Sequence, residues 1–552
     1  MTKYQQFPSV ELDKRDWPNN KIETAPVWCS VDLRDGNQAL IEPMGADKKI
    51  RLFKTLVDMG YKEIEVGFPS ASQTDFDFTR ELIENGHIPD DVTIQVLVQA
   101  RRELIERTCE ALAGVKNAII HVYNSTSTLQ RNVVFKMDME GIKEIAVNGA
   151  KMVKDLSQGL IESGSNIRYQ YSPESFTQTE LPYALEVCEA VLDTFGATKE
   201  NPVIINLPAT VEVASPNVHA DQIEWMHKNF SNRERLILSL HPHNDRGTGV
   251  AATELALMAG ADRVEGTLFG NGERTGNVCL VTLGLNMHTQ GVDAKIDFSN
   301  LDEIVKVCEY CTQLPVHERH PYAGKLVYTA FSGSHQDAIN KGMKALKEQN
   351  SDTWNVPYLP IDPRDVGRDY EAIIRINSQS GKGGIAYIME ADYGIKIPKK
   401  MQASFSQVVQ KNSDKSGQEQ SSKDIYEQFK ATYLENVSPF EYISHESRVD
   451  THSSEKRVIN AKIKENGTEV NIEGVGTGPI DAFVKAMCEK SGNHLVVQDY
   501  SEHAVSSGDE AVAIAYIEVA DDNGKSFFGS AMDKNITSAS LKAIISAFNN
   551  AK

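Results

Sequence analysis

The chain has 552 residues, which at roughly 100–200 residues per domain is enough for two to four domains, including one enzyme-sized core. The apolar share of 40% and the charged share of 24% are typical of a globular protein, and no stretch approaches the roughly 18 consecutive apolar residues of a membrane span. Lys and Arg number 57 against 77 Asp and Glu, and the net charge of −20 repels nucleic acids and anionic membranes. Small anions remain open as ligands, because a metal ion or an arginine can hold one locally.

Seven cysteines are few for this length and odd in number, which is typical of reduced thiols rather than of a disulfide framework. Cys308 and Cys311 form the one close pair, and their spacing on a predicted helix favours packing over a zinc site. The first 20 residues contain no apolar core and predict neither a signal peptide nor a transit peptide. We therefore expect a cytoplasmic protein.

Between Pro26 and Leu268, short apolar runs of strand length alternate with longer segments of helical period. The predicted strands are Val27–Leu33, Glu63–Gly67, Val92–Val98, Ala118–Tyr123, Ile167–Tyr171, Val203–Leu207, Leu236–Leu240 and Arg263–Leu268. The predicted helices include Asp47–Met59, Thr74–Asn85, Met139–Ser163, Leu181–Phe195 and Thr248–Ala259. Eight such units predict an α/β TIM (β/α)8 barrel at residues 26–300, after an N-terminal extension at 1–25. A doubly wound open sheet shares this local pattern and is the alternative.

The rest of the chain predicts three further parts. Residues 301–398 read as a mostly helical subdomain, with a loop rich in proline and aspartate at Val356–Arg368. Gln, Ser and Lys dominate Lys399–Lys423, so we expect a linker or mobile segment there and linking helices up to residue 446. Residues 447–552 predict a separate α+β domain, with strands at Arg457–Ile463, Val470–Ile472, His494–Tyr500 and Ala511–Val519 and helices at Ile480–Ser491 and Ser538–Asn549.

Polar side chains capable of binding a metal follow several of the predicted barrel strands, where a TIM barrel places its chemistry. His241 and His243 are two residues apart at one strand end, so both imidazoles point the same way. Asp35 follows another strand, and Asn277 adds an amide oxygen. A lone His-x-His pair is a weak signal, but the four together predict a divalent-metal site with positions left for substrate. Mg²⁺, Mn²⁺ and Zn²⁺ all accept this ligand set.

Three more residues lie near these ligands in the predicted barrel. Arg34 can stabilise an oxyanion beside the metal, with a plain salt bridge as the alternative. Glu174 can act as a general base or position one, with a helix cap or loop charge as the alternative. Thr210 can hydrogen-bond a substrate carboxylate, or can simply pack.

Two glycine-rich runs predict turns. Ser380–Gly384 lacks the spacing of a nucleotide-binding loop before its lysine, so a turn or hinge is the simpler interpretation. Gly474, Gly476 and Gly478 lie between a predicted strand and a predicted helix. Their GxGxG spacing differs from the dinucleotide fingerprint. We interpret the run as a tight turn whose backbone N–H groups can hold an amino-acid carboxylate at the start of a helix.

Several motifs of the chain recur in one known family. In the predicted barrel they are Arg34-Asp35-Gly36, His241-Pro242-His243-Asn244-Asp245 and Gly270-Asn271-Gly272-Glu273-Arg274-Thr275-Gly276-Asn277. Beyond it they are Gly333–Ala338, Pro357–Pro363, Ser378–Gly384 and Gly474–Ala482. These motifs resemble those of the DRE-TIM metallolyases, and within them those of the 2-isopropylmalate synthases. The likeness covers nearly the whole chain. Gly36 departs from the third position of the DRE signature, as it does throughout this branch.

The resemblance implies a Claisen condensation of acetyl-CoA with 3-methyl-2-oxobutanoate, giving 2-isopropylmalate and CoA in the first committed step of leucine biosynthesis. It implies a divalent metal, Mg²⁺ first, with Mn²⁺ or Zn²⁺ as alternatives and K⁺ as an activator. His335 becomes the candidate base, delivered by the other subunit of a homodimer, with Glu174 as its partner and Tyr370 in support. A structural or CoA-binding role is the alternative for His335. His121 becomes a substrate-binding residue.

The resemblance also implies that leucine inhibits the enzyme through the C-terminal domain. We expect deletion of residues 447–552 to leave activity and abolish this inhibition. The same chemistry on pyruvate (citramalate synthase) or 2-oxoglutarate (homocitrate synthase) is the nearest competing function, because one methylene in a pocket changes selectivity by only about 1–3 kcal/mol. A carbon–carbon lyase and a non-catalytic amino-acid sensor are two further functions that the same barrel could carry.

Overall fold

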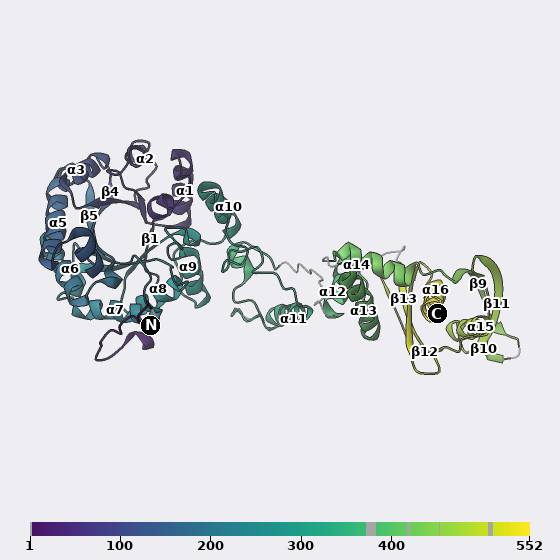
Figure 1. Cartoon of the computed structure of the whole chain (residues 1–552). Helices are drawn as coiled ribbons and strands as arrows, with labels where there is room; N and C mark the ends of the chain where they lie inside the picture. Colours follow the sequence, from purple (N-terminus) through teal and green to yellow (C-terminus); the bar gives the residue numbers. More distant parts are fainter. Residues whose placement is uncertain (1–2, 351, 371–381, 417–419, 452, 506–511) are drawn as a thin grey trace. The chain divides into compact units, whose positions relative to one another are not determined.

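The computed structural model describes residues 3–350, 352–370, 382–416, 420–451, 453–505 and 512–552. The chain divides into two compact units (Figure 1). The first comprises Met1–Val327 and Ile361–Asp369, and the second comprises Tyr328–Pro360 and Tyr370–Lys552.

The first unit is a closed barrel of eight parallel strands, in which β1 pairs with both β2 and β8. The strands are β1 (Val27–Ser30), β2 (Glu63–Gly67), β3 (Thr93–Gln99), β4 (Asn117–Ser125), β5 (Asn166–Glu174), β6 (Val203–Ala209), β7 (Leu236–Pro242) and β8 (Arg263–Gly266). The closed sheet confirms the predicted TIM barrel and rules out the open doubly wound sheet.

Helices surround the barrel (Figure 1). They are α1 (Ala46–Met59), α2 (Gln73–Glu84), α3 (Arg102–Ala111), α4 (Thr128–Gln130), α5 (Met139–Glu162), α6 (Leu181–Phe195), α7 (Pro216–Asn229), α8 (Gly249–Met258), α9 (Leu280–Thr289) and α10 (Leu301–Thr312). Helix α6 shows why they form: Ala184, Val187, Cys188 and Val191 recur at helical spacing and are buried, and Gly196 ends the helix in the left-handed conformation.

Two barrel strands are shorter than the sequence predicted. β1 ends at Ser30 because the chain enters a π-helical turn, η2 (Asp32–Gly36). β8 ends at Gly266, before the 3₁₀ turn η6 (Leu268–Gly270). The Asp32 carboxylate joins the two turns, since it accepts from Leu268 N at 3.0 and 3.1 Å. These turns place Arg34 and Asp35 at the C-terminal end of the barrel.

The cysteines take structural positions. Cys308 and Cys311 are both buried on α10, and all seven cysteines are free thiols. Within the described part of the chain, no helix is long and apolar enough to cross a membrane.

The second unit begins with helices α11 (Gly333–Gln349), α12 (Lys382–Tyr393), α13 (Lys399–Ser416) and α14 (Ser422–Phe429). The expectation of a linker at Lys399–Lys423 is wrong for α13. Met401, Phe405 and Val409 recur every four residues on this helix and are fully buried. They pack with Ile514 and Tyr516 of the C-terminal domain in one apolar core. Of the predicted turn, Ser380 and Gly381 lie outside the described residues, and Lys382 begins α12.

The C-terminal domain contains two antiparallel sheets, each packed on one helix. Strands β9 (Phe440–Asp450), β10 (Ser453–Glu465) and β11 (Thr468–Gly476) precede α15 (Pro479–Ser491), and strands β12 (Val496–Ala504), β13 (Ala513–Ala520) and β14 (Ser526–Asp533) precede α16 (Ile536–Asn550). One apolar core joins both halves. The α+β prediction is confirmed.

The sequence missed two strands of this domain, β9 and β14. In β9, Phe440 is the one buried position, and the other positions are exposed or only half-buried, so no apolar alternation shows. In β14, Gly529 lies against α16, where an added Cβ would come within 2.1 Å of the carbonyl oxygen of Ala543. Because β9 begins at Phe440, deletion of residues 447–552 would cut this strand and expose the core shared with α13, so point substitutions are the better test of regulation.

Candidate active site

A cavity of about 300 Å³ opens at the mouth of the barrel. The side chains that line it come from the C-terminal ends of several strands and the loops that follow. The predicted site residues among them are Arg34, Asp35, His121, Glu174, Thr210, His241 and His243. Residues that are far apart in the sequence therefore meet in one cavity.

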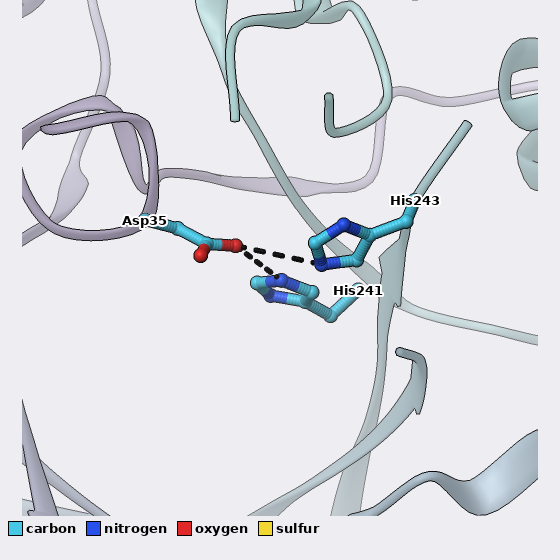
Figure 2. A group of neighbouring side chains, drawn as sticks. All are labelled: Asp35, His241 and His243. Carbon is cyan, nitrogen blue, oxygen red and sulfur yellow. Dashed lines mark hydrogen bonds and ion pairs between the residues drawn. The ribbon is translucent and has the colours of Figure 1, made fainter. Parts of the chain in front are cut away.

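Asp35, His241 and His243 form a group able to hold a metal ion (Figure 2). All three are buried, and one ligand atom from each lies within 4.8 Å of the others. Asp35 Oδ2 is the common neighbour, 2.9 Å from His241 Nε2 and 3.6 Å from His243 Nε2. His241 lies near the end of β7 and His243 directly follows the strand; because alternate residues of an extended chain point the same way, both imidazoles face Asp35.

Two buried polar atoms beside this group have no hydrogen-bond partner. They are Asn277 Oδ1, on a residue 1% exposed, and His243 Nδ1. Asn277 Nδ2 donates to Asp35 Oδ2 at 2.8 Å and lies 3.1 Å from His241 Nε2. The amide can turn over to present its oxygen in place of its nitrogen. Two imidazoles, a carboxylate and an amide oxygen then match the donors of a divalent cation, so these residues fit the predicted metal.

The charge states of the ligands follow from their neighbours. His241 donates from Nδ1 to Glu265 Oε2 at 2.7 Å. Burial opposes protonation of His241, but its hydrogen bonds to Asp35 and Glu265 outweigh burial and raise its pKa to about 9. Burial and the nearby His241 charge lower the pKa of His243 to about 4. Burial would raise the pKa of Asp35, but the Arg34 charge and the His241 hydrogen bond hold it well below its ordinary value.

Arg34 is fixed between two carboxylates. Its Nε donates to Glu65 Oε1, its Nη1 lies 3.2 Å from Asp35 Oδ1, and its side chain is 10% exposed. The guanidinium therefore lies beside the predicted metal ligands. Two residues after Arg34, the carbonyl oxygen of Gly36 accepts from Asn271 Nδ2 at 2.9 Å. A Cβ added at Gly36 would lie 3.2 Å from the same nitrogen. This tight contact explains why a side chain is disfavoured at the third position of the motif.

Three other predicted residues line the same cavity. His121 donates from Nδ1 to Glu65 Oε2 at 2.8 Å and its Nε2 lies 2.7 Å from Ser172 Oγ. Glu174 accepts from the Ser125 hydroxyl. The Thr210 hydroxyl accepts from Ser175 N at 2.9 Å, which fixes the turn after β5.

Comparison with known proteins covers the whole chain. The HMGL-like family model matches residues 25–308, a model described as alpha-isopropylmalate synthase, post-catalytic domain-like, matches 325–390, and the LeuA allosteric (dimerisation) domain matches 419–552. The 2-isopropylmalate synthase of Rhodospirillum rubrum is 58% identical over 548 residues, covering 99% of this chain and 98% of its own. This chain belongs to the 2-isopropylmalate synthase family.

Other relatives agree. The 2-isopropylmalate synthase of Brucella suis is 59% identical over 549 residues, covering 99% of this chain and 98% of its own. The 2-isopropylmalate synthase of Clostridium acetobutylicum is 57% identical over 553 residues, covering 100% and 99%. The resemblance that the motifs predicted is confirmed, and the chain is an enzyme of this family. The citramalate and homocitrate synthase functions are not favoured.

His335 and Tyr370, the other predicted catalytic residues of this 2-isopropylmalate synthase family member, belong to the second unit. His335 is exposed in the first turn of α11, and its ring stacks on that of Tyr358 with centroids 4.0 Å apart. Their roles stay predictions.

The glycine run begins inside β11 and ends at α15. Gly474 and Gly476 are strand residues that pair with Ile459 and Arg457 of β10, so the predicted turn is wrong for these two glycines. Of the three, only Gly478 lies beyond the strand, and the contacts give the other two a packing role. A Cβ at Gly474 would lie 2.1 Å from the carbonyl oxygen of Ala482, and one at Gly476 would lie 2.4 Å from its nitrogen. Gly478, the N-cap of α15, has no atom within 4 Å of the added Cβ. Thr477 N–H already donates to Asp481 Oδ2 at 2.8 Å. The proposed leucine contact at this turn stays a prediction.

Sequence reasoning missed the buried residues below the cavity, Glu65, Gln95 and Glu265, all 0% exposed. The available signal was a charged or amide residue next to apolar residues within a predicted strand. Such a residue points into the barrel, where a polar group requires a partner.

Proposed function

We propose that the chain condenses acetyl-CoA with 3-methyl-2-oxobutanoate to give 2-isopropylmalate and CoA. The observation that carries this is the buried group of Asp35, His241 and His243 with Arg34 beside it, in a barrel-mouth cavity of a chain of this family. The names of the close relatives support the same reaction.

Asp35, His241, His243 and Asn277 would hold the metal, Mg²⁺ first and Mn²⁺ or Zn²⁺ as alternatives, with K⁺ as an activator to be tested alongside. When bound, a divalent cation polarises the keto group of a 2-oxo acid as a Lewis acid. Arg34 is held beside Asp35 by Glu65, so it is placed to stabilise the negative charge that develops on the keto oxygen.

The remaining walls of the cavity suit the rest of the substrate. Phe68, Leu97 and Pro208 provide apolar surface for the isopropyl group. Thr210 and His121 provide polar atoms for the carboxylate of the 2-oxo acid. The described lining of the cavity offers one further guanidinium, Arg274, and this is paired with Asp245 at 2.6 Å. A second carboxylate, as in 2-oxoglutarate, would therefore displace an existing ion pair.

The methyl group of acetyl-CoA must lose a proton before it attacks, so a base is required. We assign this step to His335 with Glu174, and Tyr370 in support. Glu174 lines the cavity at the end of β5, where its carboxylate accepts from Ser125. Substitution of His335 by Gln should then lower the rate of acetyl-CoA methyl-proton exchange in deuterated water, with the affinity for the 2-oxo acid retained.

The proposal is tested by release of the CoA thiol from acetyl-CoA with Mg²⁺ or Mn²⁺ and each of 3-methyl-2-oxobutanoate, pyruvate and 2-oxoglutarate, with and without a chelator. We expect chelator-sensitive turnover, fastest with 3-methyl-2-oxobutanoate. Faster turnover of another oxo acid would overturn the substrate, and thiol release without metal would overturn the role of the ligands.

We further propose a homodimer, supported by the match to the dimerisation domain, in which leucine inhibits through the C-terminal domain in a cytoplasmic setting. Gly478→Ala adds a methyl group to open space at the N-cap of α15. We expect it to raise the leucine concentration for half-inhibition by about ten-fold if leucine binds there, because a methyl-sized misfit changes binding by about 1–3 kcal/mol. Unaltered inhibition by leucine would place its site elsewhere.

A further inference from the structure

Below the cavity, five buried side chains and Arg34, whose side chain is 10% exposed, form a closed ring of hydrogen bonds and ion pairs. Arg34 Nε donates to Glu65, and Gln95 Nε2 donates to Glu65 Oε2 at 2.6 Å and to Glu265 Oε1 at 3.0 Å. His241 Nδ1 donates to Glu265 Oε2 at 2.7 Å, and His241 Nε2 lies 2.9 Å from Asp35 Oδ2. Asp35 Oδ1 lies 3.2 Å from Arg34 Nη1 and closes the ring. The ring joins the charge-stabilising arginine to two of the metal ligands by two routes, one direct and one through Gln95.

Gln95 is the ring member that contacts neither Arg34 nor a metal ligand in these hydrogen bonds. It lies on β3, is 0% exposed, and bridges two carboxylates that are also 0% exposed. Arg263 Nη2 donates to Gln95 Oε1 at 2.9 Å, so the amide is held with its nitrogen toward the carboxylates. The reverse orientation would place an amide oxygen against two carboxylates and the amide nitrogen against a guanidinium.

This arrangement fixes the distance between the two carboxylates. Without the N–H groups of Gln95 between them, the carboxylates of Glu65 and Glu265 would repel each other across a low-dielectric interior. Each carboxylate holds one functional group: Glu65 holds Arg34, and Glu265 holds the ring of His241. A shift of one carboxylate would therefore move the group that it holds.

We propose that Gln95 is a positioning residue that sets Arg34 and His241 as one unit, so that metal affinity and charge stabilisation depend on the same amide. The inference deepens the proposed function, because it rests on the metal site assigned above. Residues that orient metal ligands typically change affinity by roughly 10–100-fold when replaced.

The test compares Gln95→Met with Gln170→Met. Gln170 is also 0% exposed and donates to the same Glu265 oxygen at 2.7 Å, but no hydrogen bond of the ring passes through it. Mn²⁺ affinity is measured by calorimetry without substrate, and kcat is measured at saturating Mn²⁺. We expect Gln95→Met to weaken Mn²⁺ binding by about ten-fold and to lower kcat by about ten-fold more than Gln170→Met does.

Equal Mn²⁺ affinity and equal kcat in the two variants would overturn the proposal. If the two variants lost only melting temperature, and lost it equally, Gln95 would be merely structural. If Gln95→Met does not fold, Gln95→Asn and Gln170→Asn replace the pair, because the shorter amide stays polar and cannot reach both carboxylates. The Mn²⁺ comparison needs no turnover. The affinity comparison therefore remains valid even if the proposed reaction is wrong. Equal affinities together with normal turnover would reject the positioning role of Gln95 and leave the proposed reaction standing.

Discussion

The interior of the barrel and the core of the C-terminal domain are built from opposite kinds of side chain. Below the barrel mouth, Glu65, Gln95, Arg263 and Glu265 are all 0% exposed and hydrogen-bonded to one another. The C-terminal core contains apolar side chains such as Phe440, Ile459, Phe483, Leu541 and Ile544, each 0% exposed. One region buries charge and the other buries hydrocarbon.

The difference shows which region serves which purpose. A buried charge network is a weak source of stability, because desolvation offsets much of the attraction between its charges. Perturbed titratable groups of this kind cluster at functional sites. Apolar burial, in contrast, contributes stability in proportion to the area removed from water. We therefore expect substitutions in the barrel interior to affect function first, and those in the C-terminal core to affect stability first.

The largest functional effect is expected for Asp35→Asn. Asp35 is the shared neighbour of both histidines, and its loss removes the charged ligand of the predicted metal site. Turnover should fall by at least about 100-fold and Mn²⁺ binding should weaken in parallel, since replacement even of outer residues changes affinity by roughly 10–100-fold. Thiol release and calorimetry measure the two quantities, with the exposed Asp58→Asn on α1 as control. Normal Mn²⁺ affinity in Asp35→Asn would remove the ligand assignment.

Phe483→Ala tests the other side of the comparison. Phe483 is 0% exposed in the core between α15 and the sheets. The substitution should lower the free energy of unfolding of the C-terminal domain by about 3–5 kcal/mol, through lost transfer energy and a residual cavity. Urea denaturation followed by circular dichroism measures it. Mn²⁺ affinity at the barrel should stay within error of the wild type, and a loss there would show that the two regions are not independent.

Arg34→Lys separates charge from geometry. Lysine keeps the charge but cannot hold Glu65 and Asp35 with one planar fork. We expect kcat to fall by about 100-fold, the effect of removing one stabilising donor, with a smaller change in KM for the 2-oxo acid. Steady-state kinetics at saturating metal decide this. A KM effect alone would mean that Arg34 binds the ground state rather than the developing charge.

The most gradual effect is a pH dependence of metal binding, about ten-fold for each pH unit. Burial lowers the pKa of His241, but its hydrogen bonds to Asp35 and Glu265 outweigh burial and raise the pKa to about 9. The metal-free site therefore holds a proton that a cation must displace. Mn²⁺ affinity should rise about ten-fold per pH unit up to about pH 9, with one proton released per ion. His243, with a pKa of about 4, is already neutral in that range. Calorimetry at about pH 6.5, 7.5 and 8.5 in two buffers tests this, and a flat affinity would contradict it.

The sequence predicted much of the barrel because its signals are local. The alternation of strand and helix patterns follows from which face each element buries, and the helix at Leu181–Phe195 was predicted with its bounds. The grouping of the candidate ligands could be predicted because parallel strands of a barrel all end on one side, so that Asp35, His241 and Asn277 had to gather there. The resemblance to a known family then supplied the chemistry.

Tertiary structure decided what depends on distant neighbours. Helix α13 has the polar composition of a linker, yet the residues at every fourth position are buried against Ile514 and Tyr516, which are distant in the sequence. The ring through Gln95 joins strands β2, β3, β7 and β8 to the turn after β1, and no local pattern marks it. Periodicity reports which side of an element is buried, whereas the partner of a buried polar group is set only when the closed sheet brings separate strands together.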